Sequence, residues 1–258
     1  MHKGPNLQQD LQHLIMKWRQ YQYAYTADIE KMYRQIMIHS EDQSYQKILW
    51  RDSENQPLRI YQLTTLTFGF KVAPYIAMQC LKRLAEEEKE QYPDAARALD
   101  QDFYMDDYCG GSHTIPKANQ LRRDLVELLA KSGFNLRKWT ANDPRILENS
   151  QTTTNQEEET FEFKVQSDST KTLGLGWKPT IDKFYFKSTI EMTTKPPTKR
   201  SLLSDISKLF DPLGWLTPIS INMKILFQTV WLSALDWSDT LPEDIATKWT
   251  SLRQDIQC

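Results

Sequence analysis

The sequence has few of the residues on which disulfide frameworks and zinc sites depend. It contains three cysteines, none in a CxxC pair, and four histidines without an HExxH motif. An odd number of unclustered cysteines favours a reducing compartment over a disulfide scaffold. The scattered histidines give little support to zinc chemistry. Zinc catalysis therefore has little basis in this composition.

Long apolar runs and an excess of either charge are also missing. No run approaches the length of a membrane-spanning helix, and the first residues, MHKGPNLQQDL, lack the apolar core of a signal peptide. The formal net charge is −2 over 258 residues, so no overall basic field draws the chain to nucleic acid. We expect an intracellular protein without membrane contact, in which nucleic acid is bound by local patches.

The first 148 residues combine strand and helix patterns. Apolar spacing and turn residues predict a helix over 6–20, a strand over 21–28, two strands around a turn at 52–57, a helix from Pro74, a hairpin over 103–110 and a helix that ends at Gly133. This order of elements predicts an α+β fold with a palm-like layer.

Composition changes twice after this part of the chain. Residues 149–159 form a polar, loop-like stretch, and the window 163–200 holds eight Lys and Arg against three Asp and Glu. That local excess could hold a nucleic-acid backbone, or it could simply be solvated basic residues on strands. Helical patterns follow Pro197. We predict three parts: residues 1–148, 149–195 and 196–258.

The stretch FYMDDYCGG, residues 103–111, places two aspartates between strand-forming arms. Adjacent carboxylates repel each other unless a cation compensates them. Asp106 and Asp107 are therefore either a solvated turn or metal ligands at the tip of an anchored hairpin. Asp28, at the predicted end of a strand, could add a third carboxylate and complete a two-metal site for phosphoryl transfer. Taken alone, Asp28 could equally be the N-cap of a helix.

An ordered series of motifs resembles the palm of reverse transcriptases. ADIEKMY, FGFKVAP and YMDD follow one another at suitable spacings, and ILWRD, GFNLRKWTAN, LGLGW and LFDPLGWLTPISINMKILFQ resemble the Bel/Pao group of LTR retrotransposons. The resemblance implies a right-hand polymerase palm with partial fingers (1–148), primer-grip-like strands within 149–195, and a mainly helical thumb- or connection-like region (196–258). It also implies an RNA-directed DNA polymerase that uses dNTPs and an RNA or DNA template with a primer. Its expected compartment is cytoplasmic particles, with nuclear passage.

The same resemblance implies a metal site and its ligands. Asp28 and Asp106 would be the principal ligands, Asp107 a less direct third carboxylate, and Ile29 a backbone ligand. The ions would be two Mg²⁺, for which Mn²⁺ could substitute.

Further residues are carried over as contacts of the incoming nucleotide. The backbone amides of Ile29 and Glu30 would approach the triphosphate. Tyr33 would exclude a 2′-hydroxyl, although from the residues alone it is a core aromatic. Phe68 and Gly69 would lie near the nascent base pair, where a Cβ on Gly69 would collide; a plain loop glycine is equally compatible with the pattern.

The resemblance also implies one cation and one hairpin near the substrates. Lys138 of RKWT would neutralise the leaving pyrophosphate, although its offset from Gly133 is shorter than in retroviral enzymes. Leu173, Gly174 and Trp177 of LGLGW would grip the primer terminus, and a plain β-turn would use the same glycines.

The chain departs from the family pattern at both ends. A fingers segment would precede residue 1, and we expect no RNase H-like segment downstream, so we expect a fragment of a polyprotein. Two alternatives stay open. One is a catalytically silent remnant that binds nucleic acid or acts as a scaffold, and the other is a different two-carboxylate enzyme, such as a glycosidase. Oligomeric state is not indicated.

Overall fold

The computed structural model describes residues 2–147, 170–173, 175–186, 195–209 and 211–257. The chain divides into two compact units. The first comprises Met1–Leu173 with Pro179–Asp182, and the second comprises Gly174–Lys178 with Lys183–Cys258.

A four-stranded antiparallel sheet forms the centre of the first unit. Its strands are β1 (Tyr23–Ile29), β4 (Phe103–Tyr104), β5 (Asp107–Ser112) and β6 (Leu136–Ala141), in the order β4-β5-β1-β6. The central strand β1 pairs with β5 from Tyr23 to Asp28 and with β6 on its other edge. The predicted hairpin over residues 103–110 is confirmed as β4 and β5. β6 is a strand that the sequence patterns did not predict.

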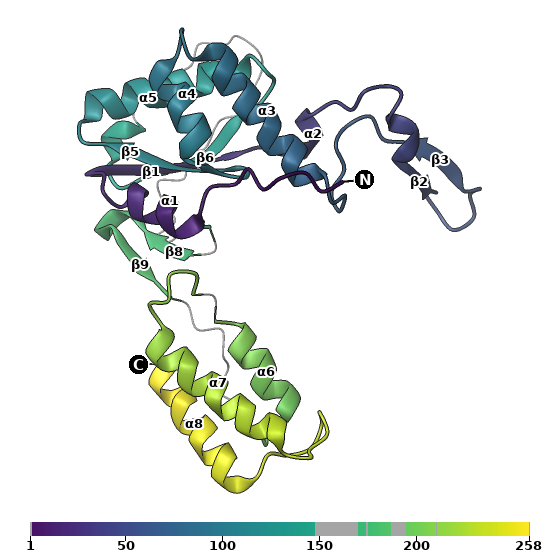
Figure 1. Ribbon diagram of the computed structural model, residues 1–258, viewed down its shortest axis with the longest axis vertical. Helices are drawn as coiled ribbons and strands as arrows, with labels where there is room; N and C mark the ends of the chain where they lie inside the picture. Colours follow the sequence, from purple (N-terminus) through teal and green to yellow (C-terminus); the bar gives the residue numbers. More distant parts are fainter. Residues whose placement is uncertain (1, 148–169, 174, 187–194, 210, 258) are drawn as a thin grey trace. The chain divides into compact units, whose positions relative to one another are not determined.

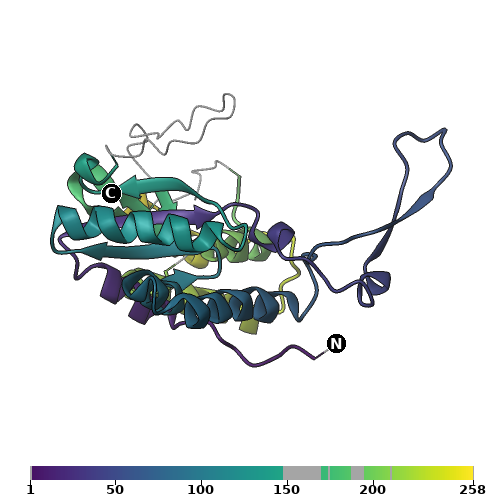
Figure 2. The ribbon, with the colours of Figure 1, turned by 90° about the horizontal axis from the view of Figure 1, so that it is seen from above.

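Helices cover both faces of this sheet (Figure 1). Helices α3 (Ala73–Glu88), α4 (Pro93–Gln101) and α5 (Ile115–Ala130) lie on one face, and α1 (Leu11–Trp18) contacts β4 and β5 from the other. Figure 2 shows α3 and α5 running alongside the strands. The predicted helix start at Pro74 and end near Gly133 are confirmed, because Pro74 lies in the first turn of α3 and Gly133 has φ +75°. Helix α4 was not predicted.

The core of the first unit forms where these helices meet the sheet. Large side chains at its centre are almost fully buried: Tyr25, Ile29, Leu81, Leu99, Phe103, Tyr108 and Leu125. Because β1 is buried on both faces, the carboxylate at its end is carried by a rigid element.

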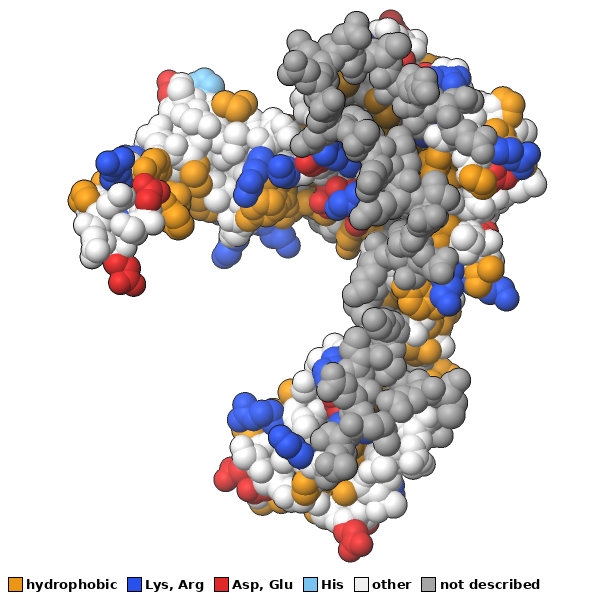
Figure 3. Space-filling model, turned by 180° about the vertical axis from the view of Figure 1, so that it is seen from behind, with side chains coloured by type: hydrophobic (Ala, Val, Ile, Leu, Met, Phe, Trp, Pro, Cys, Tyr) orange, Lys and Arg blue, Asp and Glu red, His pale blue; other side chains and the backbone are white. Residues whose placement is uncertain are grey.

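The remaining elements of the first unit lie at its margins. They are α2 (Met32–Gln35), β2 (Lys47–Trp50), β3 (Arg59–Gln62), β7 (Thr170–Thr172) and three 3₁₀ turns (Gln43–Tyr45, Pro144–Ile146, Pro179–Ile181). The strands β2 and β3 confirm the two predicted around residues 52–57. All eight of their residues are exposed, and Figure 3 shows apolar and basic side chains side by side on this hairpin.

The second unit has a short hairpin and three helices. Its elements are β8 (Leu175–Lys178), β9 (Lys183–Tyr185), α6 (Lys199–Ser207), α7 (Thr217–Leu232) and α8 (Glu243–Gln257). The helices enclose a core of their own: Leu202, Met223, Leu226, Val230, Leu241, Ile245 and Trp249. The helical character predicted after residue 195 is confirmed. Within the described part of the chain, no helix is long and apolar enough to cross a membrane.

Candidate active site

Three aspartates lie on neighbouring segments where the end of β1 pairs with the start of β5, beside the β4–β5 turn. Asp28 of β1 pairs directly with Asp107 of β5, so their Cα atoms are cross-strand neighbours. Asp106 occupies the tip of the hairpin, and its carbonyl oxygen accepts a hydrogen bond from the Ile29 amide at 2.8 Å. The N-cap interpretation of Asp28 is wrong, because Asp28 lies in a strand and Lys31 is the N-cap of α2.

A two-residue turn holds Asp106 at the hairpin tip. Tyr104 pairs with Asp107, which leaves Met105 and Asp106 as the turn residues. Met105 has φ +58°, whereas Asp106 has no positive φ. This order matches a type II′ turn, in which glycine is the usual first residue. A methionine in that position holds the backbone in a strained conformation immediately before a candidate ligand.

A β-bulge in β6 brings a lysine to the carboxylates. Thr26 pairs with Thr140 and Asp28 pairs with Arg137, so β6 has one residue more than β1 between these two pairs. Lys138 lies in this bulge with φ +54°, and its Nζ is 3.3 Å from Oδ2 of Asp28. Bulges are a common means of redirecting a side chain near a functional site. The structure therefore brings Lys138 to the predicted site.

Burial and mutual repulsion act on the hairpin carboxylates. Partial burial, followed by the charges of Asp106 and Asp28, raises the pKa of Asp107 to about 6. Burial is also the main cause that raises the pKa of Asp106 above its ordinary value. Lys138 opposes both shifts. A titratable cluster perturbed by several like charges is typical of functional sites.

The donor set suits a hard divalent cation. All three candidate side-chain ligands are carboxylates, and Lys138 is the cation that lowers the pKa of Asp107 against the charges of Asp106 and Asp28. The residues present therefore fit Mg²⁺. Among the described residues, no three His, Cys, Asp or Glu side chains are already arranged around a common metal position. Without an ion, Asp28 is paired with Lys138, and the charges of Asp106 and Asp28 raise the pKa of Asp107.

The turn after Asp28 engages, within the chain, two amides that were expected to approach a triphosphate. The amide of Ile29 donates to Asp106, and the amide of Glu30 donates to the carbonyl of Asn135 at 2.9 Å. Both amides have acceptors within the chain in this conformation, and their approach to a triphosphate stays a prediction. The Glu30 carboxylate forms ion pairs with Arg137 (2.6 Å) and Lys31 (3.7 Å). No motif in the sequence identified Arg137; only its place beside Lys138 could have done so.

Tyr33 and Phe68, two predicted nucleotide contacts, pack together. Their ring centroids are 4.7 Å apart in an edge-to-face arrangement. Tyr33 is half-buried, and its pKa is raised first by burial and then by the charge of Asp106. Phe68 is 62% exposed, so its ring is available to a ligand. The structure thus brings Tyr33, Phe68 and Asp106 into one region.

Gly69 has a backbone conformation that favours glycine, and the expected collision of a Cβ with the nascent base pair stays a prediction. Its φ is +90°, and a Cβ at this position would meet no described atom within 4 Å. The glycine is therefore required by its backbone conformation rather than by crowding within the chain.

The two described primer-grip candidates have buried side chains. Trp177 is fully buried and Leu173 is 9% exposed, so neither side chain is presented to a ligand. Gly174 lies outside the described residues. The assignment of these residues to a hairpin that grips the primer stays a prediction, and the pattern of glycines and aromatics did not reveal which face of the hairpin is buried.

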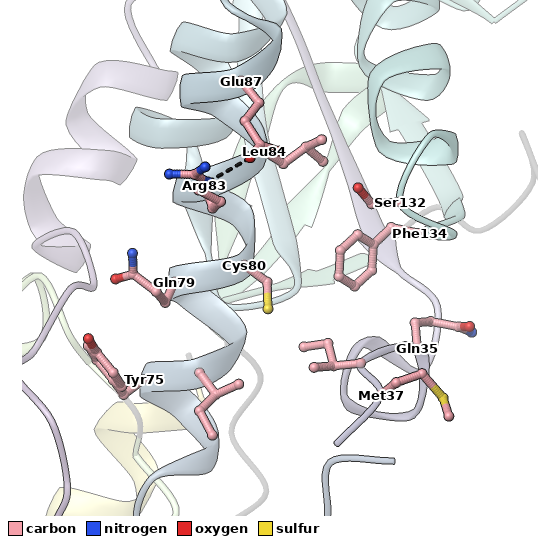
Figure 4. Close-up of a pocket in the computed structure, with 12 residues that line it drawn as sticks. Gln35, Met37, Tyr75, Gln79, Cys80, Arg83, Leu84, Glu87, Ser132 and Phe134 are labelled. Carbon is pink, nitrogen blue, oxygen red and sulfur yellow. Dashed lines mark hydrogen bonds and ion pairs between the residues drawn. The ribbon is translucent and has the colours of Figure 1, made fainter. Parts of the chain in front are cut away.

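A cavity of about 500 Å³ lies away from the carboxylates (Figure 4). It opens between α3 and the segments around Met37 and Phe134. Cys80 and Phe134 point into it, and an ion pair between Arg83 and Glu87 lies at its edge. Burial raises the pKa of the Cys80 thiol, which disfavours the reactive thiolate. No predicted site residue lines this cavity, so it does not form part of the candidate active site.

The fold and this arrangement agree with comparisons to known proteins. Residues 1–142 match the family model described as reverse transcriptase (RNA-dependent DNA polymerase). Because this match covers more than half of the chain, the chain belongs to the reverse transcriptase family. Residues 198–258 match the model described as Pao retrotransposon-like RNaseH-like domain. The resemblance to a Pao-type retrotransposon reverse transcriptase is confirmed, and the expectation that no RNase H-like segment is present is contradicted by this match.

A solved structure shows the same fold. The foamy viral protease-reverse transcriptase in complex with an RNA/DNA hybrid aligns with 97% of this chain at a TM-score of 0.62 and 13% sequence identity. This chain spans 29% of that chain's length. No curated protein matches the sequence. The predicted α+β reverse-transcriptase fold is thereby confirmed, whereas the division at residues 148 and 195 and the thumb- or connection-like assignment stay predictions.

Proposed function

We propose that this chain contains the catalytic palm of an RNA-directed DNA polymerase, which joins a primer 3′-hydroxyl to the α-phosphate of a dNTP. The observation that carries the proposal is the pairing of Asp28 with Asp107 beside Asp106 at the hairpin tip. Carboxylates on rigid strands are the side chains that two-metal phosphoryl transfer requires. The sheet holds these three in place through buried arms on both sides.

The metal proposal rests on the donor set. Asp28 and Asp106 would be the principal ligands, Asp107 a weaker third, and the carbonyl oxygen of Ile29 a backbone ligand. Two Mg²⁺ ions, or Mn²⁺ in their place, would activate the attacking hydroxyl and neutralise the leaving oxygen. Members of the reverse transcriptase family generally use divalent metals, which supports this choice.

The neighbouring side chains have proposed roles in binding the nucleotide. Tyr33, supported by Phe68, would lie under the sugar and exclude a 2′-hydroxyl by its bulk. Gly69 would shape the adjoining loop through its positive φ. Lys138 would move from Asp28 to the triphosphate and stabilise the developing charge on pyrophosphate.

The partners proposed for this activity are a primed RNA or DNA template and dNTPs. The nucleic acid is supported by the family match and by the hybrid bound to the foamy viral protein. The compartment stays a prediction from the resemblance.

Primer extension on an RNA template with a DNA primer tests the proposal. We expect activity with Mg²⁺ or Mn²⁺, and a loss on the order of 10³-fold in Asp106→Asn, because the variant removes a charge that acts directly at the metal site. Asp94→Asn makes the same chemical change at an exposed position of α4 and should keep full activity. Equal activity in wild type and Asp106→Asn would contradict the assigned site. Absence of activity in the wild type would favour a silent, nucleic-acid-binding remnant.

A further inference from the structure

Strand β6 carries two adjacent cations, Arg137 and Lys138, to the edge of the strand that ends beyond Asp28. Asp28 pairs with Arg137 in the ladder between β1 and β6. The next pair, Ile29 with Leu136, is buried on both sides of the ladder. Directly paired residues project from one face, and successive residues project from opposite faces. Asp28 and Arg137 therefore lie together on the face that points away from the core.

Arg137 has two carboxylates within reach on this face. Asp28 is directly opposite, and the side chains of such pairs are close enough to interact. Glu30 follows Asp28 by two residues, which is the spacing of diagonal neighbours on one face. The arginine forms its ion pair with Glu30, whose Oε2 is 2.6 Å from Nε of Arg137. The nearer partner in the ladder is thus left to another cation.

Lys138 takes the place beside Asp28. It lies in the bulge, and its Nζ is 3.3 Å from Oδ2 of Asp28. A guanidinium group binds a carboxylate through two parallel N–H donors and keeps its charge at every accessible pH, whereas lysine is a point charge on a flexible stem. An arginine paired with Asp28 would therefore compete with a metal ion more strongly than the lysine does.

Glu30 is itself held in the position from which it binds Arg137. Its amide donates to the carbonyl of Asn135 at 2.9 Å, so backbone and side chain both tie it to the segment that forms β6. The side chains of Glu30 and Arg137 are only 24% and 39% exposed. Lys31 lies farther from the same carboxylate, at 3.7 Å, and is 61% exposed. The ion pair with Arg137 is therefore the stronger of the two.

We propose that Glu30 is a positioning residue, which holds Arg137 away from Asp28 and so keeps the Asp28 carboxylate accessible to a divalent metal ion. The inference rests on the proposed function, because it takes Asp28 as a metal ligand. It concerns the carboxylate of Glu30, whereas the resemblance assigned only the backbone amide of this residue.

Mn²⁺ binding to the protein without nucleotide or nucleic acid tests the proposal, with the unbound ion followed by electron paramagnetic resonance. Glu30→Gln should weaken Mn²⁺ binding on the order of tenfold, because Arg137 would then pair with the ligand that Glu30 protects. Arg137→Gln should bind Mn²⁺ at least as tightly as the wild type. Glu30→Gln/Arg137→Gln should return to within about twofold of the wild type, since the competing cation is gone.

A matched double variant separates ion pairing from net charge. Glu30→Gln/Lys31→Gln has the same net charge as Glu30→Gln/Arg137→Gln but keeps the arginine, so its Mn²⁺ binding should stay weak. If Glu30 attracted the metal only through its negative charge, both double variants would recover equally. Equal recovery would overturn the proposal, as would an equal effect of Glu30→Gln in the wild-type and Arg137→Gln backgrounds.

The single arginine variant keeps the proposal testable if Glu30→Gln does not fold. Thermal midpoints without metal show which variants are folded. Removal of a competitor cannot weaken the binding of the ion with which it competes. Weaker Mn²⁺ binding in an Arg137→Gln protein that keeps the wild-type thermal midpoint would therefore overturn the proposal.

Asp28→Asn and primer extension show which of the two proposals fails. Mn²⁺ binding and extension that both depend on Asp28, together with additive effects at Glu30 and Arg137, would overturn the positioning role alone. Coupled effects on Mn²⁺ binding in a protein that does not extend primers would support the positioning role and count against the polymerase. Mn²⁺ binding that Asp28→Asn leaves unchanged would overturn both the metal site and the positioning role.

Discussion

The hairpins β4–β5 and β8–β9 both bring like charges together, but they are held in different ways. In β4–β5 the charges are Asp106 and Asp107, and its strands extend a sheet whose Phe103 and Tyr108 are fully buried. In β8–β9 the charges are the lysines Lys178 and Lys183, which pair directly. Trp177 of β8 is fully buried, whereas β9 has no buried residue among its three. Both strands of β4–β5 are therefore anchored by a buried aromatic side chain, and only one strand of β8–β9 is.

The largest expected difference lies in the aromatic residues of the two hairpins. Phe103→Ala should lower the free energy of unfolding by about 3 to 5 kcal/mol, because it leaves a cavity in the sheet core. Phe186→Ala, next to β9 and 37% exposed, should cost less than about 1 kcal/mol. Urea denaturation of both variants measures the difference, and equal losses would remove the contrast in anchoring.

The turns provide a second comparison, since each contains a residue with positive φ that is not glycine. Met105→Gly should raise the free energy of unfolding by about 0.5 to 1 kcal/mol, as relief of strain outweighs the added freedom of the unfolded chain. Asp182→Gly should give no gain, because it also removes the ion pair with Arg19. Chemical denaturation checks both, with Met105→Ala as a control that removes the side chain and keeps the strain. A destabilised Met105→Gly would show that the turn is not strained.

The smallest expected effect concerns repulsion at the carboxylates. Without divalent metal, Asp107→Asn should stabilise the protein by roughly 0.2 to 1 kcal/mol, because it removes one of three like charges. Adding Mg²⁺ should raise the thermal midpoint of the wild type more than that of the variant, since an ion that binds only the folded state stabilises it. An equal rise in both proteins would contradict a role for Asp107 in metal binding.

Local signals in the sequence predicted most of the first unit. Pro74 and Gly133 marked helix ends, and the arms of FYMDDYCGG marked a hairpin, because each signal depends on neighbours in the chain. Helix α4 and strand β6 were not predicted. β6 (LRKWTA) has two adjacent charged residues and a bulge at Lys138, so it lacks the alternation of an isolated strand pattern and forms by pairing with the edge of β1.

The sequence predicted those site residues that lie at the ends of strands. Asp28, Asp106 and Asp107 lie together because two antiparallel neighbours end at the same edge of the sheet. The hydrogen bonds that engage the amides of Ile29 and Glu30 depend on distant segments, which periodicity does not reveal. The burial of Trp177 and the pairing of the hairpin lysines likewise depend on register, and a shift by one residue would exchange the two faces.

Because Lys138 is paired with Asp28, a metal ion that binds Asp28 must replace the lysine ammonium group. A divalent ion that approaches Asp28 meets a carboxylate already paired with the Lys138 ammonium group at 3.3 Å. The Lys138 side chain is otherwise 77% exposed. The measured free energy of metal binding would therefore be that of the metal–carboxylate contact less that of the ion pair it replaces. Binding of the ion would release the ammonium group of Lys138, which could then contact an anionic substrate. Metal binding and release of the lysine would be coupled.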